Sequence, residues 1–316
     1  MKRQSNFSRI LREIAEEEGM ILTSFSEDWA FSLEKDGKKL FIVSHHFPLN
    51  PASVSELCRD KALTFEVLSS CGIPAAEHVF LPNTSYSAYQ GQASTEEQAR
   101  EYLKKHGRIV LKDNYGTGGN RVFFAADEEA LYEAVKELLS RTAALSLSPY
   151  YEIEAEYRAV VLDGTVRLVF SKERPYVLSD GKSTVRELLQ GALENVGSEA
   201  ALKNRMTEED PERTPEAGTK VFLNWKHNLG QGAIARVLQE DETKSELSRL
   251  AIRAANALNV RFASVDMIRT EDSLMVLEVN SGVMMEHFAA QTEESYQAAK
   301  EIYKDAVRAY LTSLKS

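Results

Sequence analysis

Residues 264–282 read SVDMIRTEDSLMVLEVNSG, a pattern that predicts two strands joined by a short polar turn. Asp266 stands in the first apolar run, and Glu278 and Asn280 close the second. Residues two apart on a strand project from the same face, so Glu278 and Asn280 point the same way. If the strands pair through the turn at 270–273, Asp266 lies beside both.

These three side chains form a candidate metal site. Two carboxylates and an amide oxygen make an oxygen-only ligand set, which suits Mg²⁺ or Mn²⁺ bridging nucleotide phosphates. Acidic side chains within apolar strands are costly to bury unless a cation compensates their charge. The alternative is that all three end their strands in solvent, and spacing alone leaves both interpretations open.

A second candidate site is the glycine-rich segment KDNYGTGG at 112–119. Three of the chain's 16 glycines fall here within four positions, Gly116, Gly118 and Gly119. Glycines let backbone N–H groups approach phosphate oxygens, and Lys112 at the end of an apolar strand adds positive charge. The alternative is a glycine-rich hairpin that binds nothing.

Cations gather at two further places. Lys226, His227 and Asn228 stand in the loop KHNLGQG, and Lys172 and Arg174 end a strand in FSKERP. Such a run is usually a solvated charged face, and a lone loop histidine is more often an ordinary hydrogen-bonding residue than a catalytic base. Cations at three places together with an oxygen-only metal set describe a nucleotide triphosphate site better than any one does alone.

The composition of the chain narrows the class of ligand. Its 316 residues carry 38 Lys and Arg against 48 Asp and Glu, a formal net charge of −10. Nucleic-acid binding and attachment to anionic membranes both need clustered positive charge, so we expect neither partner. A chain of this length is expected to form about two domains, and the charge balance points to a small-molecule ligand.

Targeting signals are not evident in the sequence. No apolar stretch approaches the ~20 residues of a membrane span, and residues 1–19 lack the apolar core of a signal peptide. Cys58 and Cys71 stand apart from any Cys-x-x-Cys or histidine cluster, so we expect reduced structural thiols. These features predict a cytoplasmic protein.

Hydrophobic periodicity predicts an α+β fold built mainly from antiparallel hairpins. Helices are expected at 7–18, 55–72, 95–106, 128–139, 183–195, 243–258 and 293–313. Strands are expected at 29–33, 39–43, 78–81, 108–112, 122–125, 156–162, 165–172, 261–269 and 274–279, with a strand and loop at 221–232. A boundary is expected near 50–55, and a polar surface insertion at 197–218.

From about Arg59 to its end the sequence resembles the ATP-grasp superfamily. It looks most similar to the carboxylate–amine ligase branch, which includes cyanophycin synthetase, the ribosomal-protein glutamate ligase and glutathione synthetase. The segments that carry the resemblance are RDKALTFEVLSSCGIPA, IVLKDNYGTGGNRV, EYRAVVLDG, SDGKSTVRELL, KHNLGQGA and SVDMIRTEDSLMVLEVNSG. Each is moderately specific, and all six occur in the family's order.

The resemblance implies a fold that holds ATP between two mainly antiparallel sheets. A small N-terminal α/β unit would occupy 1–55, and the ATP-grasp domain 56–316. Within that domain, a lid subdomain with the glycine-rich loop would span 107–150, and a C-terminal subdomain with the metal site 151–316.

The resemblance also implies roles for residues around the nucleotide. Lys61 and Lys112 would meet its phosphates from separate subdomains. The segment Gly116, Thr117, Gly118 and Gly119 would form the mobile loop that closes over the phosphates.

Sugar and base contacts are implied nearby. Glu156 would bind the ribose hydroxyls, and the linker strand Tyr150–Ile153, with Tyr150 and Tyr151, would offer its backbone to adenine. Pro149 stands where relatives carry an acidic residue, so adenine selection is expected to rest on that backbone.

The remaining implied roles concern metal and phosphoryl transfer. Asp266, Glu278 and Asn280 match the ligands of usually two Mg²⁺ ions. Lys226, two positions before Asn228, stands where relatives often carry an arginine that stabilises the transferring phosphoryl group. Lys172 or Arg174 would meet the γ-phosphate or the acyl phosphate.

The implied activity is that of an ATP-dependent ligase. It would activate a carboxylate as an acyl phosphate and join it to the amine of an amino acid or peptide, releasing ADP and phosphate. Two alternatives stay open, namely capture of the acyl phosphate by a carrier-protein thiol and an ATP-binding regulatory module without turnover. The expected partners are small carboxylates and amines, and since many relatives are dimers or tetramers the chain is a candidate homo-oligomer.

Overall fold

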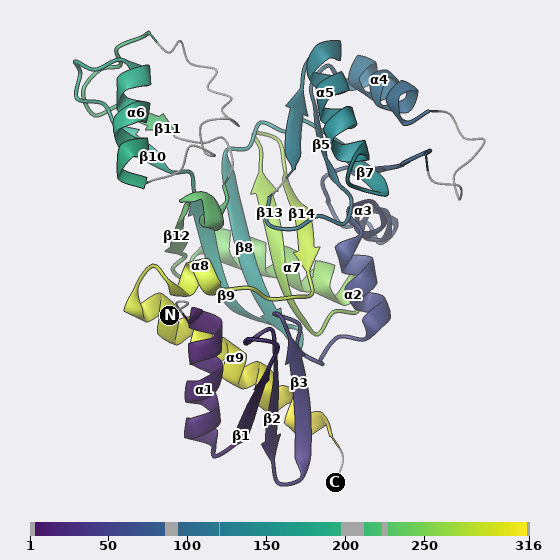
Figure 1. Cartoon of the computed structure of the whole chain (residues 1–316), viewed down its shortest axis with the longest axis vertical. Coiled ribbons are helices and arrows are strands. Elements are labelled where there is room, and N and C mark those ends of the chain that lie inside the picture. The colour runs from purple at the N-terminus through teal and green to yellow at the C-terminus, as the bar shows by residue number, and fades with distance from the viewer. Residues whose placement is uncertain (1–3, 86–93, 120, 197–211, 223–226, 315–316) are drawn as a thin grey trace. The chain divides into compact units, whose positions relative to one another are not determined.

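Contacts between residues divide the chain into two units. Unit 1 comprises Met1–Phe170 and Val237–Ser316, and unit 2 comprises Ser171–Arg236. Figure 1 labels the helices and strands. The computed structural model describes residues 4–85, 94–119, 121–196, 212–222 and 227–314.

Helix α1 (Asn6–Glu18) opens unit 1 and is delimited as the sequence predicts. The hydroxyl of Ser5 accepts a hydrogen bond from Ser8 N–H at its start, and Gly19 ends it in the left-handed conformation. Its apolar stripe is buried. The helix therefore needs a covering surface, which a sheet and a second helix supply.

The sheet is three-stranded and antiparallel, with order β1-β2-β3. Its strands are β1 (Ile21–Phe25), β2 (Ala30–Lys35) and β3 (Lys38–Val43). Asp36 and Gly37 both have positive φ in the β2–β3 turn, as the sequence predicts. The apolar pattern does not reveal β1, because four of its five side chains are exposed.

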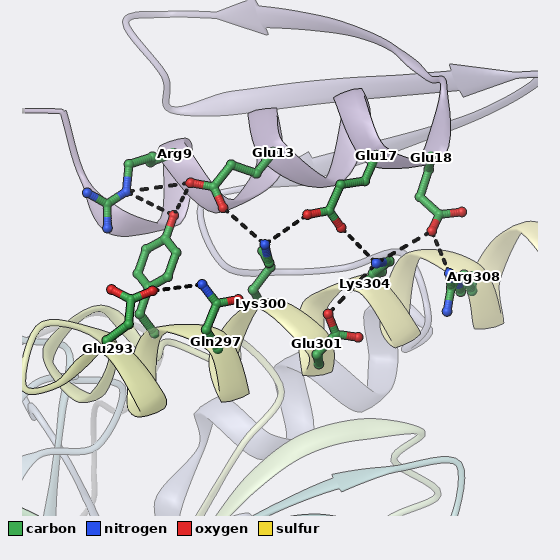
Figure 2. A network of polar contacts seen from close by, with 11 residues as sticks. Arg9, Glu13, Glu17, Glu18, Glu293, Gln297, Lys300, Glu301, Lys304 and Arg308 are labelled. Atoms are coloured by element: carbon green, nitrogen blue, oxygen red, sulfur yellow. Dashed lines mark hydrogen bonds and ion pairs between the residues drawn. The ribbon is translucent and has the colours of Figure 1, made fainter.

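Helix α9 (Glu293–Ser313) meets α1 through a row of ion pairs (Figure 2). Lys300 Nζ lies 2.8 Å from Glu17 Oε1 and 3.3 Å from Glu13 Oε2. Lys304 Nζ lies 2.7 Å from Glu17 Oε2. The row joins the first and last helices of unit 1.

The sequence predicts one helix over 55–72, and this prediction is wrong. Two helices occupy the segment, α2 (Ala52–Arg59) and α3 (Lys61–Ser70). Asp60 between them has an extended backbone, and its carboxylate accepts a hydrogen bond from the first turn of α3. Apolar periodicity does not reveal a cap, so the pattern does not show the break between the two helices. The break makes Lys61 the first residue of α3.

A four-stranded antiparallel sheet with order β4-β7-β5-β6 follows in unit 1. Helices α4 and α5 pack on one of its faces and form an apolar core with it (Figure 1). These elements are β4 (Val79–Pro82), α4 (Thr95–His106), β5 (Ile109–Asp113), β6 (Val122–Ala125), α5 (Glu128–Leu139) and β7 (Ala144–Pro149).

Strand β7 is the part of this sheet that the sequence does not predict. Its sequence ALSLSP contains two serines, Ser146 and Ser148, which weaken the apolar signal although both are buried. The predicted linker strand at 150–153 is wrong, since that segment contains no strand. The strand ends at Pro149, one residue before the linker.

In the next sheet the strands β9, β8, β13 and β14 are successive neighbours. Helix α7 packs against β8, β13 and β14, and together they enclose an apolar core. The bounds are β8 (Ala155–Leu162), β9 (Thr165–Glu173), α7 (Glu242–Ala257), β13 (Phe262–Arg269), β14 (Leu274–Asn280) and the short helix α8 (Glu286–Ala289).

Unit 2 contains a small antiparallel pair, β10 with β11, and a helix α6 that shares a core with it. Its elements are β10 (Tyr176–Leu178), α6 (Val185–Val196), β11 (Lys220–Phe222), the 3-10 turn Leu229–Gln231 and β12 (Ile234–Val237). Most of the predicted insertion, 197–211, lies outside the described residues, as does 223–226.

The elements make up the α+β fold with antiparallel sheets that the sequence predicts. The predicted domain limits at 55, 107 and 150 stay predictions. In the described part of the chain, every helix is too short or too polar to cross a membrane.

The ion pairs between α1 and α9 predict a pH-dependent stability. Hydrogen bonds from Lys300 and Lys304 lower the pKa of Glu17 to about 2. A carboxyl group whose pKa is lower in the folded state stabilises the fold above its unfolded pKa of about 4.3, and this contribution is lost as pH falls through the folded pKa. Glu17→Gln should therefore lower Tm near neutral pH but not near pH 2.

Thermal unfolding of both proteins from about pH 7 to about pH 2 checks this expectation. Glu16→Gln, at an exposed neighbour on the same helix, is the matched control and should show no pH-dependent difference. A Tm difference for Glu17→Gln that persists unchanged at the acid end would contradict it.

Candidate active site

The hairpin of β13 and β14 pairs as the sequence predicts. In this ladder Asp266 lies opposite Glu278, and Ser264 lies opposite Asn280. Directly opposed residues of an antiparallel pair project to the same face, and so do residues two apart on one strand. Asp266, Glu278 and Asn280 therefore share one face of the sheet.

A cation that the sequence does not single out, Arg158, lies on the same face. It is opposite Asp266 in the ladder between β8 and β13. Its Nε and Nη2 donate to Oδ1 and Oδ2 of Asp266 at 2.7 Å each, a bidentate ion pair. Burial lowers the pKa of Arg158, but Asp266, with smaller contributions from Glu156 and Glu278, raises it by more, so the guanidinium stays charged.

The chemistry of this set fits a hard divalent cation. Both oxygens of Asp266 accept from Arg158, yet each carboxylate oxygen has a further lone pair. Among the described residues no three His, Cys, Asp or Glu side chains cluster for a metal. Such an ion would therefore depend on two carboxylates and the Asn280 amide, and it would share Asp266 with Arg158.

Lys61 connects this face to the glycine-rich loop. Its Nζ lies 3.7 Å from Glu278 Oε1 and donates hydrogen bonds to the carbonyls of Gly116 at 2.5 Å and Asn114 at 3.3 Å. The side chain is buried. The break at Asp60 is what starts α3 at this lysine and lets it reach the loop.

Lys112 lies within electrostatic range of the same groups. Burial of its ammonium group lowers its pKa to about 8. Glu278 and Glu156 oppose this shift, whereas the positive charge of Lys61 adds to it. Two lysines and two carboxylates from α3, β5, β8 and β14 thus act on one another in unit 1.

Glu156 and the linker occupy neighbouring positions. Glu156 stands two residues before Arg158 on β8, so both project from the same face. Tyr150 packs edge-on against Phe124, with ring centroids 5.0 Å apart. The hydroxyl of Tyr151 accepts a hydrogen bond from the backbone of Glu77 at 2.9 Å, which ties the linker to the segment before β4.

The glycine-rich loop needs glycine for two different reasons. A Cβ at Gly116 would lie 2.9 Å from the Cβ of Asp113, so no side chain fits there. Gly118 and Gly119 have positive φ, which side chains disfavour. Thr117, between Gly116 and Gly118, is exposed.

The predicted phosphoryl-transfer residues belong to unit 2. Lys172 is buried, and its carbonyl accepts a hydrogen bond from His227 Nδ1 at 2.7 Å. The guanidinium of Arg174 lies 3.8 Å from the ring centroid of Phe222. Asn228 caps the 3-10 turn by accepting from Gly230 N–H. Lys226 lies outside the described residues.

The structure thus brings together the predicted residues of unit 1, and their roles stay predictions. Arg158 is the residue that sequence reasoning did not assign. A signal was present, because the strand alternation of EYRAVV places Arg158 on the face of Glu156. Nothing in the sequence shows, however, that Asp266 is its partner, since 108 positions separate the two.

The two antiparallel sheets, the glycine-rich loop and the cluster of lysines and carboxylates define the class of protein. The fold is the ATP-grasp fold that the sequence resemblance implies. Residues 221–304 match the family described as "RimK-like ATP-grasp domain".

Curated relatives align with about three quarters of this chain. The chain is 26% identical over 253 residues to cyanophycin synthetase of Nostoc sp. strain PCC 7120, covering 74% of this chain and 26% of the relative. It is 26% identical over 243 residues to tetrahydromethanopterin:alpha-L-glutamate ligase of Methanocaldococcus jannaschii, covering 76% of this chain and 64% of that ligase. The chain therefore spans about a quarter of the length of the first relative and less than two thirds of the second.

Solved structures show the same fold. A bifunctional glutathione synthetase from Pasteurella multocida superposes with a TM-score of 0.55 at 15% identity, covering 95% of this chain and 44% of that one. D-alanine–D-alanine ligase from Bacillus anthracis superposes with a TM-score of 0.51 at 16% identity, covering 81% and 69%. The ATP-grasp fold expected from the sequence is confirmed.

Loss of Arg158 is expected to destabilise the protein strongly. Asp266 is only 4% exposed, and without its partner it would be an uncompensated buried charge. Removing one member of a buried pair costs about 3–5 kcal/mol. Arg158→Met should therefore lower the free energy of unfolding in urea by about that amount.

The matched control is the double variant Arg158→Met with Asp266→Asn, which removes both charges. It should regain at least half of the lost stability, because no unpaired ion is left behind. A double variant as unstable as Arg158→Met alone would show that packing of the arginine stem, rather than its charge, is what matters.

Proposed function

We propose that this chain is an ATP-dependent ligase. It activates a carboxylate as an acyl phosphate and joins it to the amine of an amino acid or peptide, with release of ADP and phosphate. The observation that carries the proposal is the joint placement of Lys61, Lys112, Glu278 and Asp266 in one unit, beside a glycine-rich loop. The amide-forming relatives support it.

The chemistry explains why such a cluster is useful. A carboxylate is a poor electrophile, because its charge repels nucleophiles and oxide is a very poor leaving group. Transfer of a phosphoryl group from ATP to a carboxylate oxygen makes phosphate the leaving group. The amine nitrogen then attacks the carbonyl carbon, the C–O bond to phosphate breaks, and the amine loses a proton to give the amide.

The positive side chains meet the main electrostatic demand of this reaction. Charge spreads over the oxygens of the phosphoryl group during transfer, and preorganised cations stabilise it. Lys61 and Lys112 are proposed to hold the phosphates in unit 1. Lys172, Arg174 and Lys226 of unit 2 are proposed to act on the transferring group.

The carboxylates and the loop are proposed to complete the site. Asp266, Glu278 and Asn280 would hold Mg²⁺ or Mn²⁺, which supplies positive charge to the phosphates when bound. Glu156 would accept hydrogen bonds from the ribose hydroxyls. The segment 116–119, whose Gly116 carbonyl is held by Lys61, would cover the phosphates and exclude the water that hydrolyses an acyl phosphate.

The setting of the reaction is proposed on the same basis. The relatives' names include an alpha-L-glutamate ligase, which favours an amino acid as one substrate. Cys58 and Cys71 are free thiols, as expected for the cytoplasm.

The lowered pKa of Lys112 predicts that ATP affinity falls in alkaline solution. The ammonium form binds phosphate, and with a pKa of about 8 it is lost as pH rises above that value. The affinity for ATP should be constant near pH 7 and should fall by up to about tenfold per pH unit above pH 8.

Isothermal titration between about pH 7 and pH 10 measures this dependence, with proton uptake on binding as a second readout. In Lys112→Arg the guanidinium stays charged, so the profile should be flat over this range. A wild-type profile as flat as that of the arginine variant would remove Lys112 from the phosphate site.

Turnover is tested by ADP release with ATP, Mg²⁺ and a panel of amino acids and small carboxylates, followed by mass spectrometry of the products. An amide product is expected. ADP release that appears only with a thiol carrier, and ends in a thioester, would replace the amine acceptor with a thiol. Tight ATP binding without turnover on any pair would favour a regulatory module.

Glu278→Gln should reduce this turnover by about a hundredfold or more, because one metal-facing carboxylate loses its charge. The circular dichroism spectrum should be unchanged. Glu271→Gln, at the exposed turn of the same hairpin, is the matched control and should keep wild-type activity. Near-normal activity of Glu278→Gln would contradict the metal assignment.

A further inference from the structure

The sheet β4-β7-β5-β6 has two unlike faces. One face contributes Leu81, Leu111 and Leu147 to the apolar core that α4 and α5 cover. Since side chains alternate along a strand, Lys112 and Ser146 lie on the other face. They are direct neighbours in the ladder between β5 and β7.

Three residues on this second face or directly beside its strands carry buried polar atoms that lack a hydrogen-bond partner within the described chain. These atoms are Nε2 of His78, Oγ of Ser146 and Nδ2 of Asn114. His78 is 3% exposed, and Ser146 and Asn114 are fully buried. Among the described residues, one further buried side-chain atom lacks a hydrogen-bond partner, namely Nε2 of His106 on α4. Buried polar groups nearly always have a hydrogen-bond partner, so three such unpaired groups (called orphans below) at one face indicate a surface that binds a ligand.

Ser146 lies in β7, whereas Asn114 directly follows the last residue of β5 and His78 directly precedes the first residue of β4. Ser146 pairs with Lys112 on one side and with Phe80 on the other. Asn114 follows Lys112 by two positions, and His78 precedes Phe80 by two. Two residues of extended chain span about 7 Å, so the three positions are spread over roughly 14 Å.

The free nitrogen of His78 can only accept a hydrogen bond. Nδ1 donates to the carbonyl oxygen of Ala76 at 2.8 Å, and because a carbonyl only accepts, the proton is on Nδ1. Burial lowers the pKa of His78 well below its ordinary value, and Lys112 and Lys61 act in the same direction. The ring is therefore neutral, and Nε2 presents a lone pair.

The other two orphans have their own polarity. Asn114 Oδ1 accepts a hydrogen bond from the backbone of Ala62 at 3.2 Å, so its free Nδ2 is a donor. Ser146 offers a hydroxyl and lies opposite Lys112 in the ladder between β5 and β7. Along the face the order is thus the acceptor of His78, then the hydroxyl of Ser146 with the cation of Lys112, then the donor of Asn114 at the start of the glycine-rich loop.

We propose that His78 recognises the base of the nucleotide, because its Nε2 accepts a hydrogen bond from the exocyclic amino group of adenine. Ser146, Lys112 and Asn114 would then line the nucleotide from the base toward its phosphates. This inference rests on the proposed function, since it takes ATP as the ligand of this face. It assigns base selection to a side chain, where the sequence alone offers only the linker backbone.

The polarity of His78 selects adenine over guanine. Adenine carries an amino donor at its six position, whereas guanine carries a carbonyl acceptor there. Two acceptors facing each other leave both unpaired, and a site built around a buried hydrogen bond rejects a ligand that cannot make it. GTP is therefore a poor ligand for this face.

Nucleotide affinity, measured by isothermal titration without turnover, tests the proposal. The ligands are ATP, GTP and purine riboside triphosphate, which has hydrogen in place of the amino group. Wild-type protein should bind ATP about tenfold or more tightly than either analogue. His78→Leu should lose affinity for ATP by about the same factor and should bind purine riboside triphosphate as the wild type does.

Two variants separate hydrogen bonding from packing. His78→Gln keeps an acceptor that can reach the same position and should restore part of the preference for ATP. Ser146→Ala, on the same buried face, should keep the ratio between ATP and purine riboside triphosphate. Thermal unfolding confirms that each variant is folded.

The outcomes distinguish this inference from the proposed function. Equal wild-type affinity for ATP and purine riboside triphosphate would overturn the role of His78 and leave the ligase proposal intact. Parallel losses for both ligands in His78→Leu would reduce the histidine to a packing residue. If no triphosphate binds the wild-type protein at all, the proposed function itself fails. Should His78→Leu not fold, the wild-type comparison still decides.

Discussion

The bidentate ion pair between Arg158 and Asp266 is the interaction on which the site depends. Two charges taken out of water are tolerated only because each of the two guanidinium N–H groups meets a carboxylate oxygen at 2.7 Å. The pair joins β8 and β13, and the register of β8, β13 and β14 places Glu156 and Glu278 on the same face as the pair. Arg158 cancels the charge of Asp266, so this polar surface on an otherwise apolar sheet can be buried. The other carboxylates keep it acidic enough to bind a cation.

The lysines complete this balance from other elements. Lys61 reaches Glu278 on one side and the carbonyl of Gly116 on the other, so the loop and the acidic face share one cation. Burial of Lys112 lowers its pKa to about 8, so its ammonium group is still charged near pH 7, and a phosphate bound beside it would stabilise that charge. The acidic chain, with its net charge of −10, thus concentrates positive charge where a polyanion is expected.

Much of the fold can be predicted because local patterns decide it. The bounds of α4 and β6 follow from caps and periodicity, and the pairing of β13 with β14 follows from alternation around a polar turn. Prediction fails where the local signal is weak or ambiguous. The serines of β7 weaken its apolar run, and the cap at Asp60 interrupts a pattern that reads as one helix. Most candidate residues of unit 1 could be named in advance, but their partners could not.

The sequence by itself determined which chemical groups are present and which face of each strand they occupy, because alternation and turn chemistry act over a few residues. Only the tertiary structure decided that Arg158 neutralises Asp266, and that His78, Ser146 and Asn114 lie buried on the face of Lys112. The physical reason is that burial and charge balance depend on strands brought together from distant parts of the chain. No local pattern records which charge will face which, or which polar atom will be left without a partner.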